Sequence, residues 1–205
     1  MPTLYTTARS ANGRKPLIAC RLLALDIEVV DVDVYAGEGQ APWYRAVNPW
    51  GKIPTLVDGA LTLWESNAIL LHLTETRGDG RLLPRASAER ALVYRWLFWE
   101  ASQWQPACAA ALAPAVGALL RGDDPPPPAW DAPPLRAQLE HLDASLASGH
   151  LVGDALTIAD IAVAGMAMYL GPCGLPRGHF PRVDAWYARL AALPAWRETA
   201  APPWR

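Results

Sequence analysis

The residues with the clearest chemical meaning are a proline that precedes an apolar run and a Glu-Ser pair that opens a predicted helix, all within residues 48–73. A cis bond between Ile53 and Pro54 would turn the backbone N–H and C=O of Ile53 outward, where they could pair with the backbone of an extended ligand. The helix that begins at Glu65 and Ser66 has free N–H groups and the positive end of its dipole at this point, and such an end binds carboxylates. Residues 48–73 therefore predict a receptor for a charged peptide.

A second group of candidate residues lies in the loop that follows the first predicted strand. This loop, A-R-S-A-N-G-R-K-P at residues 8–16, contains Ser10 and Asn12 but no cysteine, so a thiol reaction here would need a sulfur brought by the ligand. Ser10 or Asn12 could cap the following helix, which is a common use of both residues. No general base is predicted for Ser10, because no histidine lies in a triad pattern. Structural or surface roles are expected for the four histidines, which are His72, His141, His150 and His179.

An alternation of strands and helices must position these loops. The first predicted elements are a strand, a helix and a strand at Thr3–Thr7, Pro16–Leu25 and Val29–Tyr35. This order is a parallel crossover unit. The next are a short helix near Pro42–Ala46, a hairpin that turns at Asp58-Gly59, and a helix from about Glu65 to Arg77. The order βαβ then ββα predicts a thioredoxin-like domain over residues 1–78.

The rest of the chain has helical periodicity and predicts an all-helical domain over residues 85–205. The expected helices are residues 87–105 with a kinked continuation past Pro106, a buried helix at 107–120, and helices at 135–146, 157–170, 183–190 and 194–199. The run from Asp123 to Pro128 predicts a stiff exposed spacer, and such a proline run could also be a recognition site. Thr157 and Asp160 form a predicted capping box, so a structural role is expected for Asp160.

These motifs together resemble those of the glutathione transferase family. The I-P before a strand and the E-S at a helix start resemble the glutathione-binding half of the family, and T-I-A-D-I at 157–161 resembles the folding signature of its helical half. S-x-N-G-x-K resembles the theta-like and nu-like bacterial members, whose serine or threonine, helped by the asparagine, donates to the glutathione sulfur. The resemblance implies the fold of that family, with Ser10 as the catalytic residue and Asn12 as its partner.

The resemblance also implies a contact for each part of glutathione, which would be the co-substrate. Ser66 and the N-terminus of its helix would bind the γ-glutamyl carboxylate, and Glu65 would bind the ammonium group. The backbone of Ile53, which precedes Pro54, would bind the cysteinyl unit. Lys52 with Gln40 would bind the glycyl carboxylate, although Lys52 could also be a solvated turn residue.

The second substrate is expected between the two domains, against the first long helix of the helical half. Trp96, Trp99 and Gln103 fall on one face of that helix. An aromatic stripe at helical spacing is commonly core, but some of these rings could line an apolar acceptor pocket. Trp96 and Trp99 are the candidates for that pocket.

One hydroxyl donor could supply the stabilisation that such a reaction needs. Lowering a thiol pKa from about 8.5 to about 6.5 requires about 2.7 kcal/mol of preference for the thiolate. A hydrogen bond to a charged group contributes roughly 1.5 to 3 kcal/mol. Ser10, helped by Asn12 or by the helix N-terminus, is therefore in range without a general base.

The composition and the charge limit the binding partners and the cellular compartment that can be expected. The formal net charge of −2 gives no field that attracts nucleic acid or acidic lipid. The first residues lack a secretion signal and the longest apolar run is too short for a bilayer, so a cytoplasmic protein without a membrane partner is expected. The three cysteines, Cys20, Cys108 and Cys173, lie far apart and without zinc spacing, which predicts free buried thiols and no metal site.

The resemblance therefore implies a homodimeric enzyme that conjugates glutathione to a small hydrophobic electrophile. Two alternatives stay open. One is another glutathione-dependent reaction on the same fold, such as disulfide reduction, isomerisation or dehalogenation, because a fold does not fix a function. The other is a non-catalytic binding or interaction module that keeps the pocket or only the fold.

Overall fold

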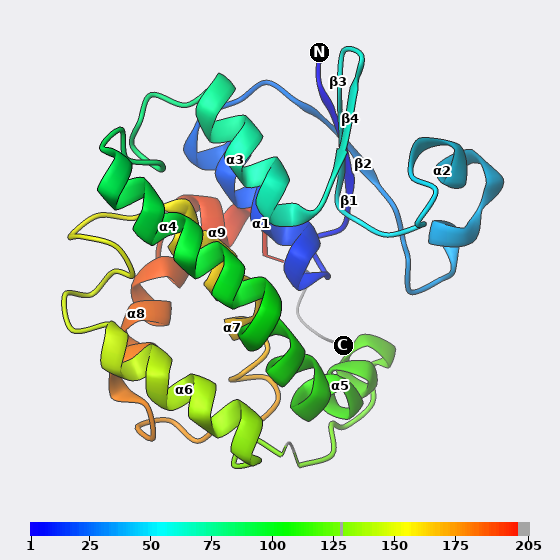
Figure 1. Cartoon of the computed structure of the whole chain (residues 1–205). Helices are drawn as coiled ribbons and strands as arrows, with labels where there is room; N and C mark the ends of the chain where they lie inside the picture. Colours follow the sequence, from blue (N-terminus) through cyan, green and yellow to red (C-terminus); the bar gives the residue numbers. More distant parts are fainter. Residues whose placement is uncertain (128, 201–205) are drawn as a thin grey trace.

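A mixed four-stranded sheet forms one side of the molecule in the computed structural model, which describes residues 1–127 and 129–200 (Figure 1). The strand order is β2-β1-β3-β4. The strands are β1 (Thr3–Thr6), β2 (Glu28–Asp31), β3 (Thr55–Asp58) and β4 (Leu61–Trp64). β1 is parallel to β2 and antiparallel to β3, which pairs antiparallel with β4. This topology confirms the thioredoxin-like plan of the first half.

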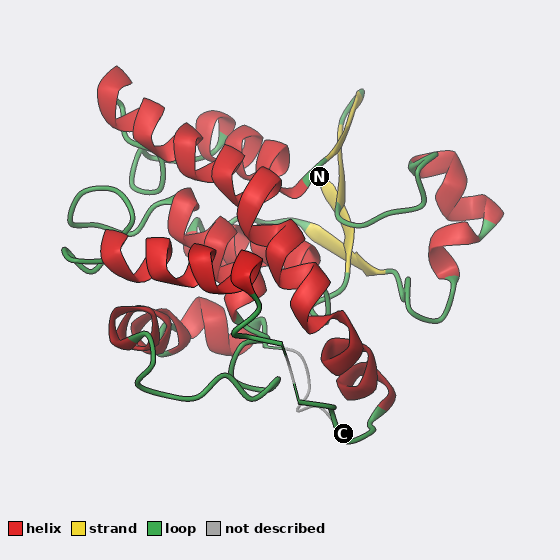
Figure 2. Ribbon diagram, turned by 60° about the horizontal axis from the view of Figure 1, so that its bottom comes forward, coloured by secondary structure: helices red, strands yellow, loops and turns green. Residues whose placement is uncertain are grey.

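Three helices accompany the sheet, at Ala11–Leu22 (α1), Pro42–Val47 (α2) and Ser66–Thr76 (α3). α1 and α3 lie between the sheet and the helical half, whereas α2 stands apart on the other side of the sheet (Figures 1 and 2). A small core of Leu4, Leu56, Ile69 and Leu73 joins the sheet to α3. The first turns of α1 and α3 thus meet at the boundary between the two halves of the chain.

The first helix begins earlier than the sequence predicted. The expected start at Pro16 was wrong, because Ser10 is the N-cap and the helix includes Pro16 in its interior. Proline suits the first turn of a helix, so Pro16 predicted a helix start. The Ser10 hydroxyl oxygen accepts a hydrogen bond from the Gly13 backbone N–H at 3.2 Å, and this cap fixes the start of the helix before Pro16. Asn12 therefore lies inside the first turn and not in a loop.

The second strand is shorter than predicted, because a turn interrupts it. Asp33 accepts hydrogen bonds through Oδ1 from the backbone N–H groups of Tyr35 and Ala36, at 3.0 and 3.1 Å. A carboxylate that binds the backbone two and three residues ahead stabilises a turn in place of a strand. Alternating valines signalled an extended segment, but β2 ends at Asp31.

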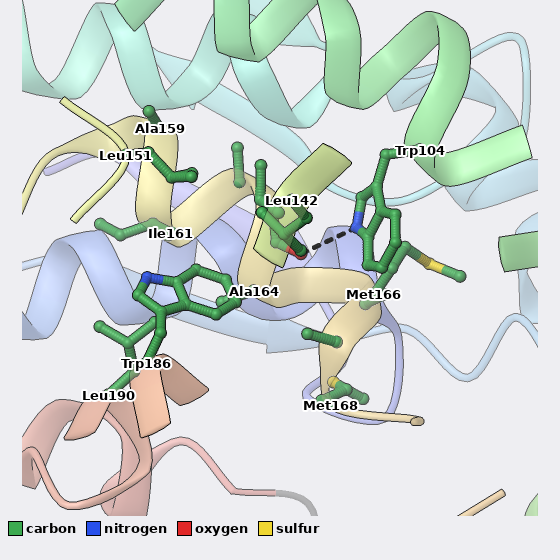
Figure 3. Close-up of a cluster of buried hydrophobic side chains, with 14 of the residues drawn as sticks. Trp104, Leu142, Leu151, Ala159, Ile161, Ala164, Met166, Met168, Trp186 and Leu190 are labelled. Carbon is green, nitrogen blue, oxygen red and sulfur yellow. Dashed lines mark hydrogen bonds between the residues drawn. The ribbon is translucent and has the colours of Figure 1, made fainter. Parts of the chain in front are cut away.

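The second half of the chain is all helical, as predicted. Its elements are α4 (Ser87–Trp99), the π-helical segment η2 (Glu100–Trp104), α5 (Gln105–Arg121), α6 (Pro133–Ser145), α7 (Ile158–Ala167), α8 (Pro181–Ala191) and α9 (Pro194–Glu198). Every residue of α7 is buried. Figure 3 shows the core around it, where the Trp104 indole N–H donates to the Val163 carbonyl at 3.0 Å. α7 is the central helix on which α1, α3, α4 and η2 pack.

The start of α7 confirms the predicted capping box. The Thr157 hydroxyl oxygen accepts from the Ala159 N–H at 3.2 Å, and the Asp160 carboxylate accepts from the Thr157 N–H at 3.0 Å. Asp160 also accepts from the Leu151 N–H and from the Trp186 indole, at 3.1 and 2.9 Å. Asp160 therefore holds a loop and α8 in place as well as its own helix.

The long helix continues past Pro106 as predicted, through η2 into α5. The expectation that residues 107–120 form a buried helix was wrong in part. Cys108, Leu112 and Ala115 are buried, whereas Pro114 on the opposite face is exposed. The apolar composition of this segment hid its two-sided character, because alanine and proline tolerate solvent on an exposed face.

Three smaller expectations concern the spacer, the thiols and the membrane. Residues 123–127 contain no helix or strand and are mainly exposed, and Pro128 lies outside the described residues. The three cysteines are free and buried, as predicted. None of the helices in the described ranges combines the length and the hydropathy that a bilayer span requires.

Candidate active site

A cleft of about 350 Å³ lies where the sheet half meets the helical half. Its lining comes from the start of α1, the loop before β3, the end of β4, the start of α3 and the start of α5. The lining residues are Asn12, Asn48, Trp50, Lys52, Ile53, Pro54, Trp64, Glu65, Ser66 and Gln105. Six of them were predicted as site residues. A cleft of this size is in the range of small-molecule sites.

The loop before β3 is held by hydrogen bonds from Tyr44 of α2 and from Asn48. The Lys52 carbonyl accepts hydrogen bonds from the Tyr44 hydroxyl at 2.6 Å and from the Asn48 side-chain amide at 2.8 Å. Burial raises the pKa of Tyr44, which keeps its hydroxyl a donor. The Ile53–Pro54 bond is cis, and the backbone N–H and C=O of Ile53 have no hydrogen-bond partner within the described part of the chain. An extended ligand backbone could pair with both groups.

The corner between β4 and α3 has an unusual backbone. Glu65 has φ 72° and ψ 114°, a region that residues other than glycine rarely adopt, and its side chain is exposed. Strained conformations of this kind occur preferentially at functional sites. Ser66 follows as the first residue of α3 and is only 7% exposed. The strained backbone therefore leaves the Glu65 side chain exposed at the cleft, next to the free N–H groups of the helix.

A chain of polar contacts runs beneath the cleft from Asn12 to the helical half. The Ser66 hydroxyl donates to Asn12 Oδ1 at 3.3 Å and accepts from Lys15 Nζ at 3.4 Å. Lys15 Nζ also donates to Glu100 Oε1 at 2.8 Å, and Asn67 Nδ2 donates to Glu100 Oε2 at 2.9 Å. Burial lowers the pKa of Lys15, and the Glu100 carboxylate opposes that shift. The cleft thus rests on a buried ion pair that joins α1 to η2.

Ser10 is not one of the residues that line the cleft. Its hydroxyl oxygen caps α1, so the alternative in which it caps a helix is observed. The cap uses a lone pair of the oxygen and leaves the hydroxyl hydrogen available for donation. Asn12 lines the cleft directly and is half-buried.

The two residues predicted for the glycyl carboxylate differ in their relation to the cleft. Lys52 lines the cleft with an exposed side chain. Gln40 lies outside the cleft lining, is exposed, and accepts a hydrogen bond from Arg45 at 3.3 Å. It does approach the neighbouring loop, since a Cβ atom added at Gly51 would lie 2.9 Å from Gln40 Nε2. Of the two residues, Lys52 therefore lines the cleft and Gln40 does not.

The two tryptophans considered for an acceptor pocket lie in the helical core and not on the cleft. The Trp96 indole donates to the Leu151 carbonyl, and the Trp99 indole donates to Gln138 Oε1, both at 3.0 Å. Their rings meet edge to face at 5.0 Å, and Trp99 stacks on Trp104 at 5.7 Å. Both rings therefore belong to the packed core, which was the alternative to an acceptor pocket.

Sequence reasoning missed four lining residues and the ion pair below them. Asn48, Trp50 and Trp64 lie inside the segment that was singled out, so the segment itself was the available signal. Gln105 comes from the helical half, and no local pattern connects it to the cleft. The partnership of Lys15 with Glu100 had no signal beyond the rarity of lysine in the chain, which has only two.

Comparisons with known proteins agree with this fold. Residues 4–81 match the glutathione S-transferase N-terminal domain and residues 131–194 match the glutathione S-transferase C-terminal domain. The chain is 32% identical over 201 residues to glutathione S-transferase F10 of Arabidopsis thaliana, with 93% of each chain covered. It resembles the structure of an epsilon-class glutathione S-transferase from the housefly Musca domestica, with a TM-score of 0.84, 25% identity, and coverage of 98% of this chain and 92% of that one. It also resembles Ure2p in complex with S-hexylglutathione, with a TM-score of 0.80, 27% identity and 97% of both chains covered. The chain therefore belongs to the glutathione S-transferase family.

Proposed function

We propose that this protein binds glutathione in the cleft and stabilises its thiolate for conjugation to a hydrophobic electrophile. One observation carries the proposal. The cleft brings together a helix N-terminus at Ser66, a carboxylate at Glu65, the free backbone groups of Ile53 and the amide of Asn12, with no cysteine in its lining. These are the groups that a γ-glutamyl peptide with its own sulfur would need.

The tripeptide would lie along the cleft with its charges matched. Its γ-glutamyl carboxylate would meet the hydroxyl of Ser66 and the N–H groups of α3, and its ammonium group would meet Glu65. Its cysteinyl unit would pair with the backbone of Ile53, which has no partner within residues 1–127 or 129–200. Lys52 would face the glycyl carboxylate. Ure2p, which resembles this chain in fold, was determined with S-hexylglutathione, and this supports a glutathione site.

The sulfur would then lie near the start of α1. Asn12 lines the cleft and can donate through Nδ2, and Ser10 has a hydroxyl hydrogen that its capping role does not use. One such donor contributes roughly 1.5 to 3 kcal/mol toward a thiolate. This serine-type arrangement, with its S-x-N-G-x-K sequence, supports our proposal of a theta-like or nu-like bacterial transferase. The electrophile would reach the sulfur between the two halves, where Gln105 of α5 completes the lining.

Exposed aromatic side chains support the proposal of a homodimer. Trp50 in the loop before β3 is 64% exposed, and its ring meets that of Trp64, which is 44% exposed, edge to face at 6.2 Å. Phe98 on α4 is 75% exposed. Large apolar side chains that gather at a surface commonly mark an interface. Sedimentation equilibrium of the protein and of a Phe98→Ser variant tests this. A parent protein that sediments as a monomer at micromolar concentration would refute the dimer.

Thermal unfolding with and without millimolar glutathione tests the proposed function. A ligand at about one hundred times its Kd stabilises the folded state by about 2.7 kcal/mol. We expect the parent to be stabilised, Ser66→Ala to lose the shift, and Ser10→Ala to keep most of it while turnover of a chlorinated aromatic substrate falls. Ser145→Ala is the matched control, because the side chain of this half-buried serine of α6 donates, among the described residues, only to the His141 carbonyl of its own helix. No stabilisation of the parent would refute a glutathione site, and faster turnover of a bis-glutathionyl disulfide than of the chlorinated aromatic would favour a reductase.

A further inference from the structure

A fully buried ion pair lies directly beneath the proposed carboxylate site. The side chains of Lys15 and Glu100 are 0% and 1% exposed, and their charged atoms are 2.8 Å apart. Room for the lysine comes from Gly165 on α7, where an added Cβ atom would lie 2.7 Å from Lys15 Cε. Pairs of this kind are expensive to desolvate and add little net stability. Their placement therefore calls for a role other than stability alone.

The carboxylate of this pair is held from a second side. Asn67 Nδ2 donates to Glu100 Oε2 at 2.9 Å and to the Leu97 carbonyl at 3.1 Å. Both partners of the amide are acceptors, so the nitrogen of Asn67 must face them. Glu100 is consequently fixed against α3, and it fixes the position of the Lys15 ammonium in turn.

The ammonium sets the direction of the hydrogen bonds above it. A charged lysine has three N–H donors and no lone pair, so at Lys15 Nζ the Ser66 oxygen can act only as an acceptor. The hydroxyl hydrogen of Ser66 must then point to another acceptor, which here is Asn12 Oδ1 at 3.3 Å. This contact is long for a hydroxyl donor. A carboxylate that arrived at the start of α3 would offer the same hydrogen a stronger acceptor.

We propose that the Lys15–Glu100 pair is a positioning device that keeps the Ser66 hydroxyl a hydrogen-bond donor, so that it passes from Asn12 Oδ1 to the γ-glutamyl carboxylate when glutathione binds. The exchange frees the Asn12 side chain at the moment the peptide is seated. Binding of the γ-glutamyl carboxylate is thereby coupled to Asn12, which would face the glutathione sulfur. This inference rests on the proposed glutathione site.

The charge of the lysine is essential to this role. A neutral amine has a lone pair and could accept from Ser66, which would reverse the hydrogen bonds and withdraw the donor from the ligand. Burial lowers the pKa of Lys15, and the Coulombic and hydrogen-bond contributions of Glu100 act against that shift. Glu100 thus serves Ser66 indirectly, by holding the proton on Lys15.

The test compares the binding of S-methylglutathione, which lacks a free thiol, to four proteins by calorimetry. They are the parent, Ser66→Ala, the double variant Lys15→Met/Glu100→Gln and the triple variant with all three changes. The double variant removes both charges together and keeps a side-chain oxygen for Asn67. The matched control is Glu75→Gln/Arg90→Met, which removes an ion pair between α3 and α4 away from the cleft.

We expect Ser66→Ala and the double variant each to weaken binding about tenfold, in line with the loss of one hydrogen bond to a charged group. The triple variant should be no weaker than Ser66→Ala, because the pair acts through that hydroxyl. The control should bind like the parent. Losses that multiply to about a hundredfold in the triple variant, or a double variant that binds like the parent, would overturn the inference. Failure of the parent itself to bind would instead refute the proposed function.

A measurement on the unmodified protein keeps the inference testable if the double variant does not fold. Lys15 and Lys52 are the only lysines, so ¹⁵N-lysine labelling gives two side-chain signals. We expect the buried one to be an ammonium at pH 7 and to shift when S-methylglutathione is added, because Ser66 changes its partner. A neutral amine at Lys15, or a signal that the ligand leaves unmoved, would contradict the positioning role.

Discussion

The Nζ atom of Lys15 lies 2.8 Å from Oε1 of Glu100, and solvent reaches neither side chain appreciably. This contact joins α1 to η2 of the helical half. It also places a positive charge under the N-terminus of α3, where the proposed ligand would bring a carboxylate. The two halves of the chain therefore meet through a polar group that belongs to the candidate site.

Removing only one partner of this pair should be more damaging than removing both. Lys15→Met leaves Glu100 buried without its counter-ion, and breaking a buried pair in this way destabilises proteins by about 3 to 5 kcal/mol. Lys15→Met/Glu100→Gln should recover most of that loss. Urea unfolding monitored by tryptophan fluorescence measures both. Equal stability of the single variant and the parent would mean that the pair is not buried in solution.

The backbone of Glu65 offers a second test, since a positive φ of 72° is strained for any residue with a Cβ atom. Glu65→Gly removes that atom, whereas Glu65→Ala keeps it and removes the same carboxylate. We expect the glycine variant to be more stable than the alanine variant by about 1 kcal/mol. Both should lose affinity for glutathione to a similar extent. A more stable alanine variant in urea unfolding would show that the corner is not strained.

Asp160 should be among the most sensitive positions of the helical half. It is fully buried and accepts hydrogen bonds from the backbone of Leu151 and Thr157 and from the Trp186 indole. Asp160→Ala leaves several buried donors unpaired, and we expect a loss of about 3 kcal/mol or more. Asp154→Asn, at an exposed site in the same loop, is the control. A loss below about 1 kcal/mol would argue against the capping role.

The pH dependence of stability should report on Asp58. Hydrogen bonds from Arg77 at 2.7 Å and from His72 at 3.1 Å hold the pKa of Asp58 below its usual range. A lowered folded-state pKa stabilises the fold above the ordinary carboxyl value of about 3.9, and this contribution is lost as the pH falls through the folded pKa. Asp58→Asn should therefore be less stable than the parent at pH 7, and the difference should shrink below about pH 4. A difference that stays constant from pH 7 to pH 3 would exclude this origin.

The three cysteines should be unreactive in the folded protein. Burial raises the pKa of Cys20 to about 12 and that of Cys173 to about 11, and it raises the pKa of Cys108 well above its usual range. Because the thiolate is the reactive form, alkylation by iodoacetamide at pH 8 should be slow in buffer and complete in urea. Mass spectrometry counts the labelled thiols. Rapid labelling of the native protein would place a thiol at the surface.

The segments that line the cleft could be predicted where they depend on a local pattern. The segment around Ile53 and Pro54 and the start of α3 at Ser66 are each set by a few neighbouring residues, and the structure brings them to one cleft. The predicted start of α1 at Pro16 was wrong, because the cap at Ser10 controls where this helix begins. Lys15 and Glu100 could not be paired in advance, since they lie far apart along the chain and no periodicity links them.

The aromatic stripe on α4 shows a different limit. Helical spacing places Trp96 and Trp99 on the inner side, but it does not say whether that side meets a cleft or a core. Packing against α6 and the Leu151 carbonyl decides the matter. Gln105, which does reach the cleft, carries no aromatic or charge signal that would have singled it out.

The most direct test of the proposed function is a titration of the ultraviolet absorbance of glutathione thiolate bound to the parent protein. The donors at Asn12 and Ser10 should lower the pKa of the bound thiol to about 6.5, compared with about 8.5 for an ordinary thiol. The thiolate absorbance should then appear when glutathione is mixed with the protein at pH 7. A bound glutathione whose thiol still titrates near 8.5 would contradict the proposal that this cleft activates the sulfur.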